Sequence, residues 1–253
     1  MRLVLLGHSD IASVFALTRL LELLPEHEAR VFFSGALQMA EGQASALSAL
    51  AQHDQRLLDQ LSASQALPKA MVEADDLPAP NSQEGLALVR DWAPDLVLSV
   101  RYRRILREDF IAIPRLGVLN LHSGILPDYK GVMATFWAML HAEREIGCTL
   151  HWIRDSGIDT GPVIDIACLP ADYKRTYLAN VLALYPPGCR MMADAVQALA
   201  RGNSLRDEAQ RANAGKYFST PQVGDLERFT AKGLRLAAPG DFATLNELFS
   251  SGK

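Results

Sequence analysis

Leu116 to Gly131 read LGVLNLHSGILPDYKG, and this stretch sets the pattern for the rest of the chain. Its apolar positions between Val118 and Leu121 predict a short buried strand. Asn120 and His122 stand two apart near the carboxyl end of that strand, so their side chains point the same way, beyond the edge of the sheet. Buried polar groups need partners or a use, and this pair is therefore a candidate for chemistry.

The residues after the strand predict a loop and then a helix. Ser123-Gly124 ends the strand, Pro127-Asp128 has the composition of a turn, and regular structure resumes after Gly131. The order of strand, loop and helix places the polar pair at the start of a loop that can line a binding site.

A second motif lies further along the chain, where Gly147 to His151 precede the run DSGIDTGPVI at Asp155 to Ile164. Together, Asn-x-His with ILPDYKG and this second motif resemble the signature of the folate-dependent formyltransferases. That family includes methionyl-tRNA formyltransferase, glycinamide ribonucleotide formyltransferase and the sugar-amine N-formyltransferases. The order and separation of the two motifs both fit, and the resemblance covers about residues 1 to 200.

The resemblance implies a set of site residues. Asn120, His122 and Asp159 fall where the family has its catalytic Asn, His and Asp. The family's folate-binding loops imply that the pterin lies between the segments 101–106 and 153–161, held mainly by backbone groups. The expected cofactor-binding residues are Arg104, Ile105, Leu106, Ile153, Asp155 and Gly157.

Each of these signals also has a purely structural interpretation when taken alone. Asn-x-His is equally a satisfied structural pair, Asp159 a turn aspartate, and the arginines at 101–104 a solvated strand end. Asp155 is a rival to Asp159, and the match of DTGPVI to the family pattern favours Asp159. His151 is expected to line the site without being essential. Nothing in the sequence has metal-ligand spacing.

The amino-terminal segment indicates the fold class. Leu3 to Leu6 predict a strand, Ile11 to Leu24 a helix stopped by Pro25, and Ala29 to Phe33 a second strand. This βαβ opening predicts a doubly wound, mostly parallel α/β sheet with a ligand cleft at the carboxyl ends of its strands. The turn after the first strand has only one glycine, so the dinucleotide-binding fingerprint is absent.

Two further expectations concern the second half of the chain. Tyr173 to Ala200 predict a helix that Pro186-Pro187 must kink or split. We expect residues 1–201 to form the catalytic domain and residues 202–253 a short C-terminal extension. This extension is too small for the barrel domain that methionyl-tRNA formyltransferases append. It should pack on the main domain or form a subunit contact, as in a homodimer.

Composition bounds the class of protein. The chain has 253 residues, of which 49% are apolar and 21% charged, as is ordinary for a globular protein. The net charge of −4 is spread without blocks, which argues against a nucleic-acid or membrane surface. Three cysteines without metal or disulfide spacing indicate reduced thiols, and neither a signal peptide nor a membrane span is evident. We therefore expect a cytoplasmic protein.

The function implied by the resemblance is transfer of a formyl group from 10-formyltetrahydrofolate to a small-molecule amine. An amino sugar, an amino acid derivative or a hydroxylamine-type acceptor would serve. One alternative is a formyltetrahydrofolate hydrolase that uses the same three residues with water as the acceptor. Another is a folate-binding module without turnover, which the intact Asn120, His122 and Asp159 set disfavours.

Overall fold

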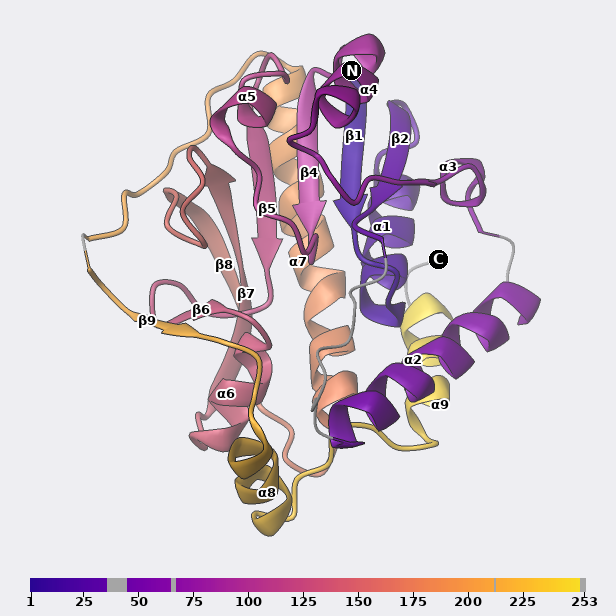
Figure 1. Cartoon of the computed structure of the whole chain (residues 1–253), viewed down its shortest axis with the longest axis vertical. Coiled ribbons are helices and arrows are strands. Elements are labelled where there is room, and N and C mark those ends of the chain that lie inside the picture. Colours follow the sequence, from indigo (N-terminus) through magenta and orange to yellow (C-terminus); the bar gives the residue numbers. More distant parts are fainter. Residues whose placement is uncertain (36–44, 65–66, 212, 251–253) are drawn as a thin grey trace.

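The computed structural model describes residues 1–35, 45–64, 67–211 and 213–250. Its centre is a seven-stranded sheet in the order β3-β2-β1-β4-β5-β7-β8 (Figure 1). The pairs from β3 to β5 are parallel, whereas β5–β7 and β7–β8 are antiparallel. The predicted mostly parallel α/β fold is confirmed. No helix among these residues is both long and apolar enough to cross a membrane.

The βαβ opening has the predicted elements, β1 (Arg2–Gly7), α1 (Ile11–Leu23) and β2 (Glu28–Phe33). Asp10 caps α1, because its Oδ1 accepts a hydrogen bond from Ser13 N at 2.8 Å. The chain leaves β1 on one side to form β2 and returns on the other side as β4 (Leu96–Val100). The turns after β1 and β4 therefore diverge, which opens a crevice at their carboxyl ends.

Between β2 and β4 the chain forms peripheral elements. These are α2 (Ser45–Ser64), α3 (Lys69–Val72), β3 (Asp75–Asp76) and α4 (Gln83–Trp92). Ser82 caps α4 through a hydrogen bond from Gly85 N to its Oγ at 3.0 Å. Figure 1 shows α2 standing away from the sheet, beside the C-terminal helix α9 (Asp241–Ser250).

Alternate residues of the strands bury into two cores, one on each face of the sheet. Leu3 and Leu5 belong to the larger core with α1 and the long helix α7 (Tyr177–Ala200), while Val4 and Leu6 belong to the smaller core with α4. A short helix, α5 (Glu108–Ile111), adds Phe110 to the smaller core. This two-sided burial is typical of a doubly wound sheet.

The second half of the sheet consists of β5 (Val118–His122), β7 (Glu145–Ile153) and the edge strand β8 (Val163–Pro170). Between β5 and β7 lie β6 (Tyr129–Gly131) and α6 (Ala134–Leu140).

Helix α7 (Tyr177–Ala200) runs the length of the sheet in Figure 1 and contains both prolines, Pro186 and Pro187, within one continuous helix. The expectation that they could split it was wrong. Buried residues lie on both sides of the prolines, including Tyr185 and Cys189, so packing outweighs the helix-breaking cost of about 3 kcal/mol for a proline. Gly188 brings α7 against β7, since a Cβ there would lie 2.5 Å from Cys148 Sγ.

Residues after 202 pack on the main sheet domain through β9 (Lys216–Phe218), α8 (Val223–Ala231) and α9. β9 pairs in parallel with β6, so residues 216–218 lie beside the loop that follows β5 (Figure 1). Phe218 stacks between Tyr129 and Trp137, with ring centroids 5.4 and 5.1 Å away. Gly131 is required at this contact, because its φ is +93° and a Cβ would lie 2.3 Å from Phe218 O.

Candidate active site

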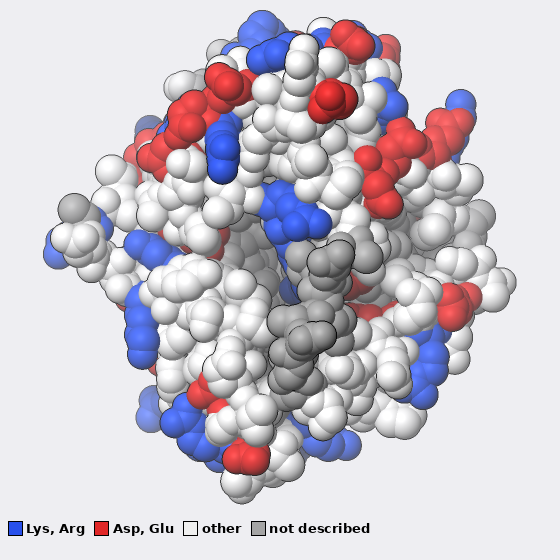
Figure 2. All heavy atoms as spheres, viewed as in Figure 1, with Lys and Arg blue, Asp and Glu red and all other residues white. Residues whose placement is uncertain are grey.

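A cavity of about 490 Å³ opens at the carboxyl ends of β4 and β5. The space-filling view shows a hollow at the centre of this face (Figure 2). Its lining includes Ser99 from β4, Asn120 and His122 from β5, and Asp159 from the loop between β7 and β8. The fold thus brings together the three residues that the sequence singled out, from two separate segments.

Asp159 is the centre of the polar cluster in the cavity. Its Oδ2 lies 3.5 Å from His122 Nδ1, and its Oδ1 lies 3.5 Å from His151 Nε2. Gly131 N donates a hydrogen bond to Oδ2 at 2.8 Å. Burial alone would raise the pKa of this carboxyl, but the charge of His122, the contacts with His151 and the Gly131 N–H lower the pKa to about 2. Asp159 is therefore ionised throughout the neutral range.

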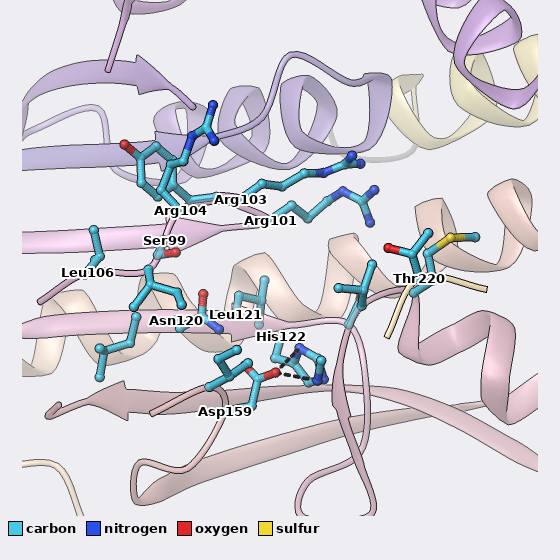
Figure 3. Close-up of a pocket in the computed structure, with 18 of the residues that line it drawn as sticks. Ser99, Arg101, Arg103, Arg104, Leu106, Asn120, Leu121, His122, Asp159 and Thr220 are labelled. Carbon is cyan, nitrogen blue, oxygen red and sulfur yellow. Dashed lines mark hydrogen bonds and ion pairs between the residues drawn. The ribbon is translucent and has the colours of Figure 1, made fainter. Parts of the chain in front are cut away.

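His122 is buried, and both of its ring nitrogens face an oxygen (Figure 3). Nε2 lies 2.6 Å from the carbonyl oxygen of Tyr129, which can only accept, so Nε2 carries a hydrogen and donates it. Nδ1 faces Asp159, as the dashed lines in Figure 3 show. A proton taken up at Nδ1 would therefore be held between the ring and an ionised carboxylate.

Asn120 is oriented by His151. His151 Nδ1 lies 2.9 Å from the carbonyl oxygen of Trp152 and must donate to it, so Nε2 of the neutral ring is an acceptor. Asn120 Nδ2 lies 3.0 Å from that Nε2 and donates one of its two hydrogens there. This assigns the orientation of the Asn120 amide and leaves its second N–H available.

The predicted cofactor-binding residues all line the cavity. Arg104, Ile105 and Leu106 come from the loop after β4, which we call the first loop, and Ile153 ends β7, with Asp155 and Gly157 in the loop that follows it. Arg104 Nε donates to the carbonyl oxygen of Ser34 at 3.2 Å, which ties the first loop to the end of β2.

The geometry separates the two rival aspartates. Asp155 is exposed, and its Oδ1 accepts a hydrogen bond from Gly157 N at 2.8 Å, which makes it a turn residue. Asp159 lies against the two histidines with 10% of its side chain exposed, and it has a left-handed φ of +53°. The strained backbone aims its carboxylate at the cluster.

Sequence reasoning missed a buried ion pair next to the first loop. Asp10 accepts from Arg101 Nε and Nη2 at 3.1 and 2.8 Å and from Arg103 Nη2 at 3.1 Å. Although burial opposes it, the two arginines hold the pKa of Asp10 well below its usual range. The pair also holds Arg101 at a left-handed φ of +58°. Asp10 and the two arginines lie about ninety residues apart in the chain, so no local sequence motif could predict that they pair.

Other lining residues come from distant segments. Asp54 on α2 and Thr220 from the C-terminal extension both line the cavity. In Figure 3, Leu106 lies at one end of the site and Thr220 at the other, with His122 between them.

A family model described as formyl transferase matches residues 33–179. A methionyl-tRNA formyltransferase of Thermosynechococcus vestitus is 39% identical over 138 residues, which are 54% of this chain and 40% of that relative. This chain spans less than half the length of the curated relatives it matches.

Two solved structures share the fold. Glycinamide ribonucleotide transformylase 1 from Symbiobacterium toebii superposes with a TM-score of 0.59 at 21% identity, covering 83% of this chain and 93% of that one. The N-formyltransferase of Helicobacter canadensis, in complex with folinic acid and dTDP-3-aminofucose, gives 0.52 at 22% identity, covering 86% of this chain and 70% of that one. Because the family model covers more than half of the residues, including both motifs around the cavity, the chain belongs to the formyl transferase family.

Proposed function

We propose that this protein transfers a formyl group from 10-formyltetrahydrofolate to the amine of a small molecule. The observation that supports this most is the convergence of Asn120, His122 and Asp159 on one wall of a cavity that two candidate folate-binding loops also line. The bound donor would supply the formyl group, which the attacking amine takes through a tetrahedral adduct with negative charge on the former carbonyl oxygen.

Asn120 stabilises this oxygen through its free N–H, and His122, whose two ring nitrogens face Tyr129 O and Asp159, stabilises it through the positive charge of its protonated ring. The free N–H of Asn120 is directed by His151, so it need not reorganise as charge develops. One such donor contributes roughly 10² to 10³ in rate, or about 3 to 4 kcal/mol. His122 contributes its imidazole, which becomes a cation when it takes up a proton.

Asp159 assists the removal of the proton from the attacking amine. As an ionised carboxylate facing His122 Nδ1, it stabilises the protonated ring, and water in the cavity can connect the amine to this pair. The proton then returns to the departing nitrogen of the folate. The carboxylate has a further role, because its bond to Gly131 N holds the loop after β5 against the site.

The donor's pterin would lie between Arg104, Ile105 and Leu106 on one side and Ile153, Asp155 and Gly157 on the other. Both loops line the same cavity as Asn120, and the neighbour from Helicobacter canadensis holds folinic acid. Asn120 and His122 line the same cavity and would hold the formyl group that N10 of the bound donor carries.

A single assay separates this proposal from its rivals. The protein is incubated with 10-formyltetrahydrofolate, with and without a panel of amines, and tetrahydrofolate and formate are measured. Amine-dependent release of tetrahydrofolate supports the transferase. Formate release without amine identifies the hydrolase, and binding without either product identifies a folate-binding module. Failure to bind folinic acid in a calorimetric titration would refute the assignment as a whole.

A further inference from the structure

Two oxygens compete for the single hydrogen on the neutral ring of His122. Tyr129 O lies 2.6 Å from Nε2, and Asp159 Oδ2 lies 3.5 Å from Nδ1. The ionised carboxylate is the stronger acceptor, but 3.5 Å exceeds the ordinary length of a hydrogen bond. The short contact with Tyr129 therefore keeps the hydrogen on Nε2, and Nδ1 stays bare to take up a proton.

The position of Tyr129 O thus decides which nitrogen can accept a proton. If this oxygen moved away from Nε2, the ring could carry its hydrogen on Nδ1 and donate it to Asp159. Its lone pair would then lie on Nε2, on the side of Tyr129. Among the described residues that line the cavity, Asp159 is present and Tyr129 is not. A ring in this second tautomer would accept protons on the side away from the substrate.

Tyr129 is fixed in place by strand β9 of the C-terminal extension, which lies beside β6 in Figure 1. Main-chain bonds flank it, because Lys216 N donates to Asp128 O at 3.3 Å and Val132 N donates to Phe218 O at 2.8 Å. The ring of Phe218 is buried and stacks on the ring of Tyr129 at an interplanar angle of 14°. A displacement of Phe218 would therefore displace Tyr129.

The phenol of Tyr129 has a second anchor on the segment after α6. Its hydroxyl donates to Glu143 Oε1 at 2.7 Å and lies 3.2 Å from His141 Nδ1. Both contacts are exposed to solvent, where water can replace a lost partner, so we expect them to hold Tyr129 less firmly than the buried stack does.

We propose that Phe218 is a positioning residue for proton transfer: it fixes Tyr129 so that Tyr129 O holds the hydrogen of His122 on Nε2 and leaves Nδ1 free for the proton of the attacking amine. Glu143 assists through the phenol. The inference rests on the proposed function, which assigns proton uptake to His122. It gives the C-terminal extension a part in the reaction, although the extension lies outside the residues 33–179 that the family model matches.

The test reads the tautomer of His122 directly, by NMR of the ring nitrogens in protein labelled at histidine. Nitrogens with and without a hydrogen resonate far apart, and the His122 signals are those that disappear in His122→Gln. At a pH at which the ring is neutral, we expect the hydrogen on Nε2 in the wild type. Phe218→Leu keeps an apolar side chain but removes the stacked ring, and should give a mixture of both tautomers.

Kinetics provide the second measurement. Phe218→Leu should lower kcat by about tenfold, because the proton acceptor is no longer held in one form, while the KM for 10-formyltetrahydrofolate stays within about twofold. Glu143→Gln keeps an oxygen that can accept from the phenol and should behave as the wild type. Glu143→Leu removes the acceptor and should lower kcat by about threefold.

Phe229→Leu is the matched control. Phe229 also belongs to the extension and is equally well buried, but its ring stacks on Phe136 of α6, with centroids 4.5 Å apart, instead of on Tyr129. This variant should lower the melting temperature as Phe218→Leu does, yet leave the tautomer and kcat unchanged.

A wild-type ring with its hydrogen on Nδ1 would overturn the inference, as would a Phe218→Leu variant with the wild-type tautomer and kcat. An equal fall in kcat in Phe229→Leu would overturn it too, since a general loss of packing would then explain the effect. The NMR measurement does not depend on turnover. If no amine is formylated but the tautomer responds as expected, the proposed function fails and the hold of Phe218 on His122 stands.

Discussion

The amide nitrogen of Asn120 carries two hydrogens, and His151 accepts one of them at 3.0 Å. His151→Leu removes this acceptor and frees the amide to rotate, so we expect kcat to fall by about tenfold because the remaining donor is no longer directed. His151→Gln offers a side-chain oxygen as acceptor and should recover part of the loss. Steady-state kinetics measure both, and kcat in the Leu variant equal to the wild type would exclude a positioning role.

Replacing the residues proposed to stabilise the oxyanion should affect the chemical step. Asn120→Ala and His122→Ala should each lower kcat by about 10²-fold or more, since the first removes a directed N–H donor and the second removes the cation. Folinic acid affinity should change much less, because the lost interaction belongs to the transition state. The losses in the double variant should not add, since the two groups act on one oxygen. Thermal melting is the control, and loss of folding in both variants would favour a structural pair instead.

The depressed pKa of Asp159 predicts how stability changes with pH. The carboxyl has a folded-state pKa of about 2 against an ordinary value of 3.8, so its contacts stabilise the fold fully above the unfolded pKa. This stability, about 2 kcal/mol for a shift of that size, is lost as the pH falls through the folded-state value.

Urea unfolding of the wild type and Asp159→Asn from pH 7 to pH 3 measures this difference. The gap between the two proteins should be constant at and above pH 5 and shrink below pH 4. Asp155→Asn removes an exposed turn carboxylate and is the matched control for loss of charge. A gap that stays the same at pH 3 would contradict the prediction.

At the scale of single residues, short motifs were enough to select Asn120, His122 and Asp159 as candidates, and the structure places all three in one cavity. It could not show that His151 orients Asn120 or that Asp10 holds Arg101 and Arg103. Those contacts depend on which strand ends become neighbours. Cross-strand pairing of Asn120 with His151 follows from the antiparallel register of β5 and β7, which the motif spacing does not encode.

Among the elements, helix α7 allows the effect of close packing on stability to be compared with the effect of intrinsic helix propensity. Gly188→Ala should favour a helix by about 1 kcal/mol in an open site. Here the added Cβ would lie 2.5 Å from Cys148 Sγ and 3.1 Å from Leu121 Cδ2, so we expect a net loss of stability of about 1 to 3 kcal/mol. Because Leu121 lies between Asn120 and His122 on β5, the substitution should also lower kcat.

The rescue variant for this contact is Cys148→Ala. Removing Sγ opens the space that the methyl group added by Gly188→Ala needs, so the double variant should be more stable than the sum of the two single changes predicts. Chemical denaturation measures the coupling. Additive losses would mean that the sulfur contact does not limit the approach of α7 to β7.

The elements with clear periodicity were predictable, including β1, α1 and the strand β5. Two features were not. The two prolines of α7 suggested a break, but burial on both sides of them keeps the helix continuous. Residues 75–81 include the aspartates, prolines and asparagine that are typical of a loop, yet Asp75–Asp76 form β3, because they pair with β2 in a long-range contact that no local pattern encodes.

At the scale of the whole molecule, the net charge of the protein indicates which kind of acceptor it can bind. With 25 basic and 29 acidic side chains, the chain gains little from counterion release on a phosphate backbone. We therefore predict no tight, salt-sensitive binding of initiator tRNA in a gel-shift assay, although the curated relatives are methionyl-tRNA formyltransferases. A salt-dependent shift at submicromolar protein would show that a nucleic acid is the acceptor.

The pairing of β6 with β9 also has a consequence for synthesis on the ribosome. Residues 129–131 belong to the loop after β5, but their partners at 216–218 are translated much later. At roughly 5 to 20 residues per second, about 5 to 20 s separate the emergence of His122 from that of Phe218. During this interval the nascent chain can form the central sheet, while the loop after β5, whose Gly131 N–H binds Asp159, still lacks β9 and the ring of Phe218 that pack on it. This side of the candidate active site is thus completed late in biogenesis, after most of the sheet has emerged.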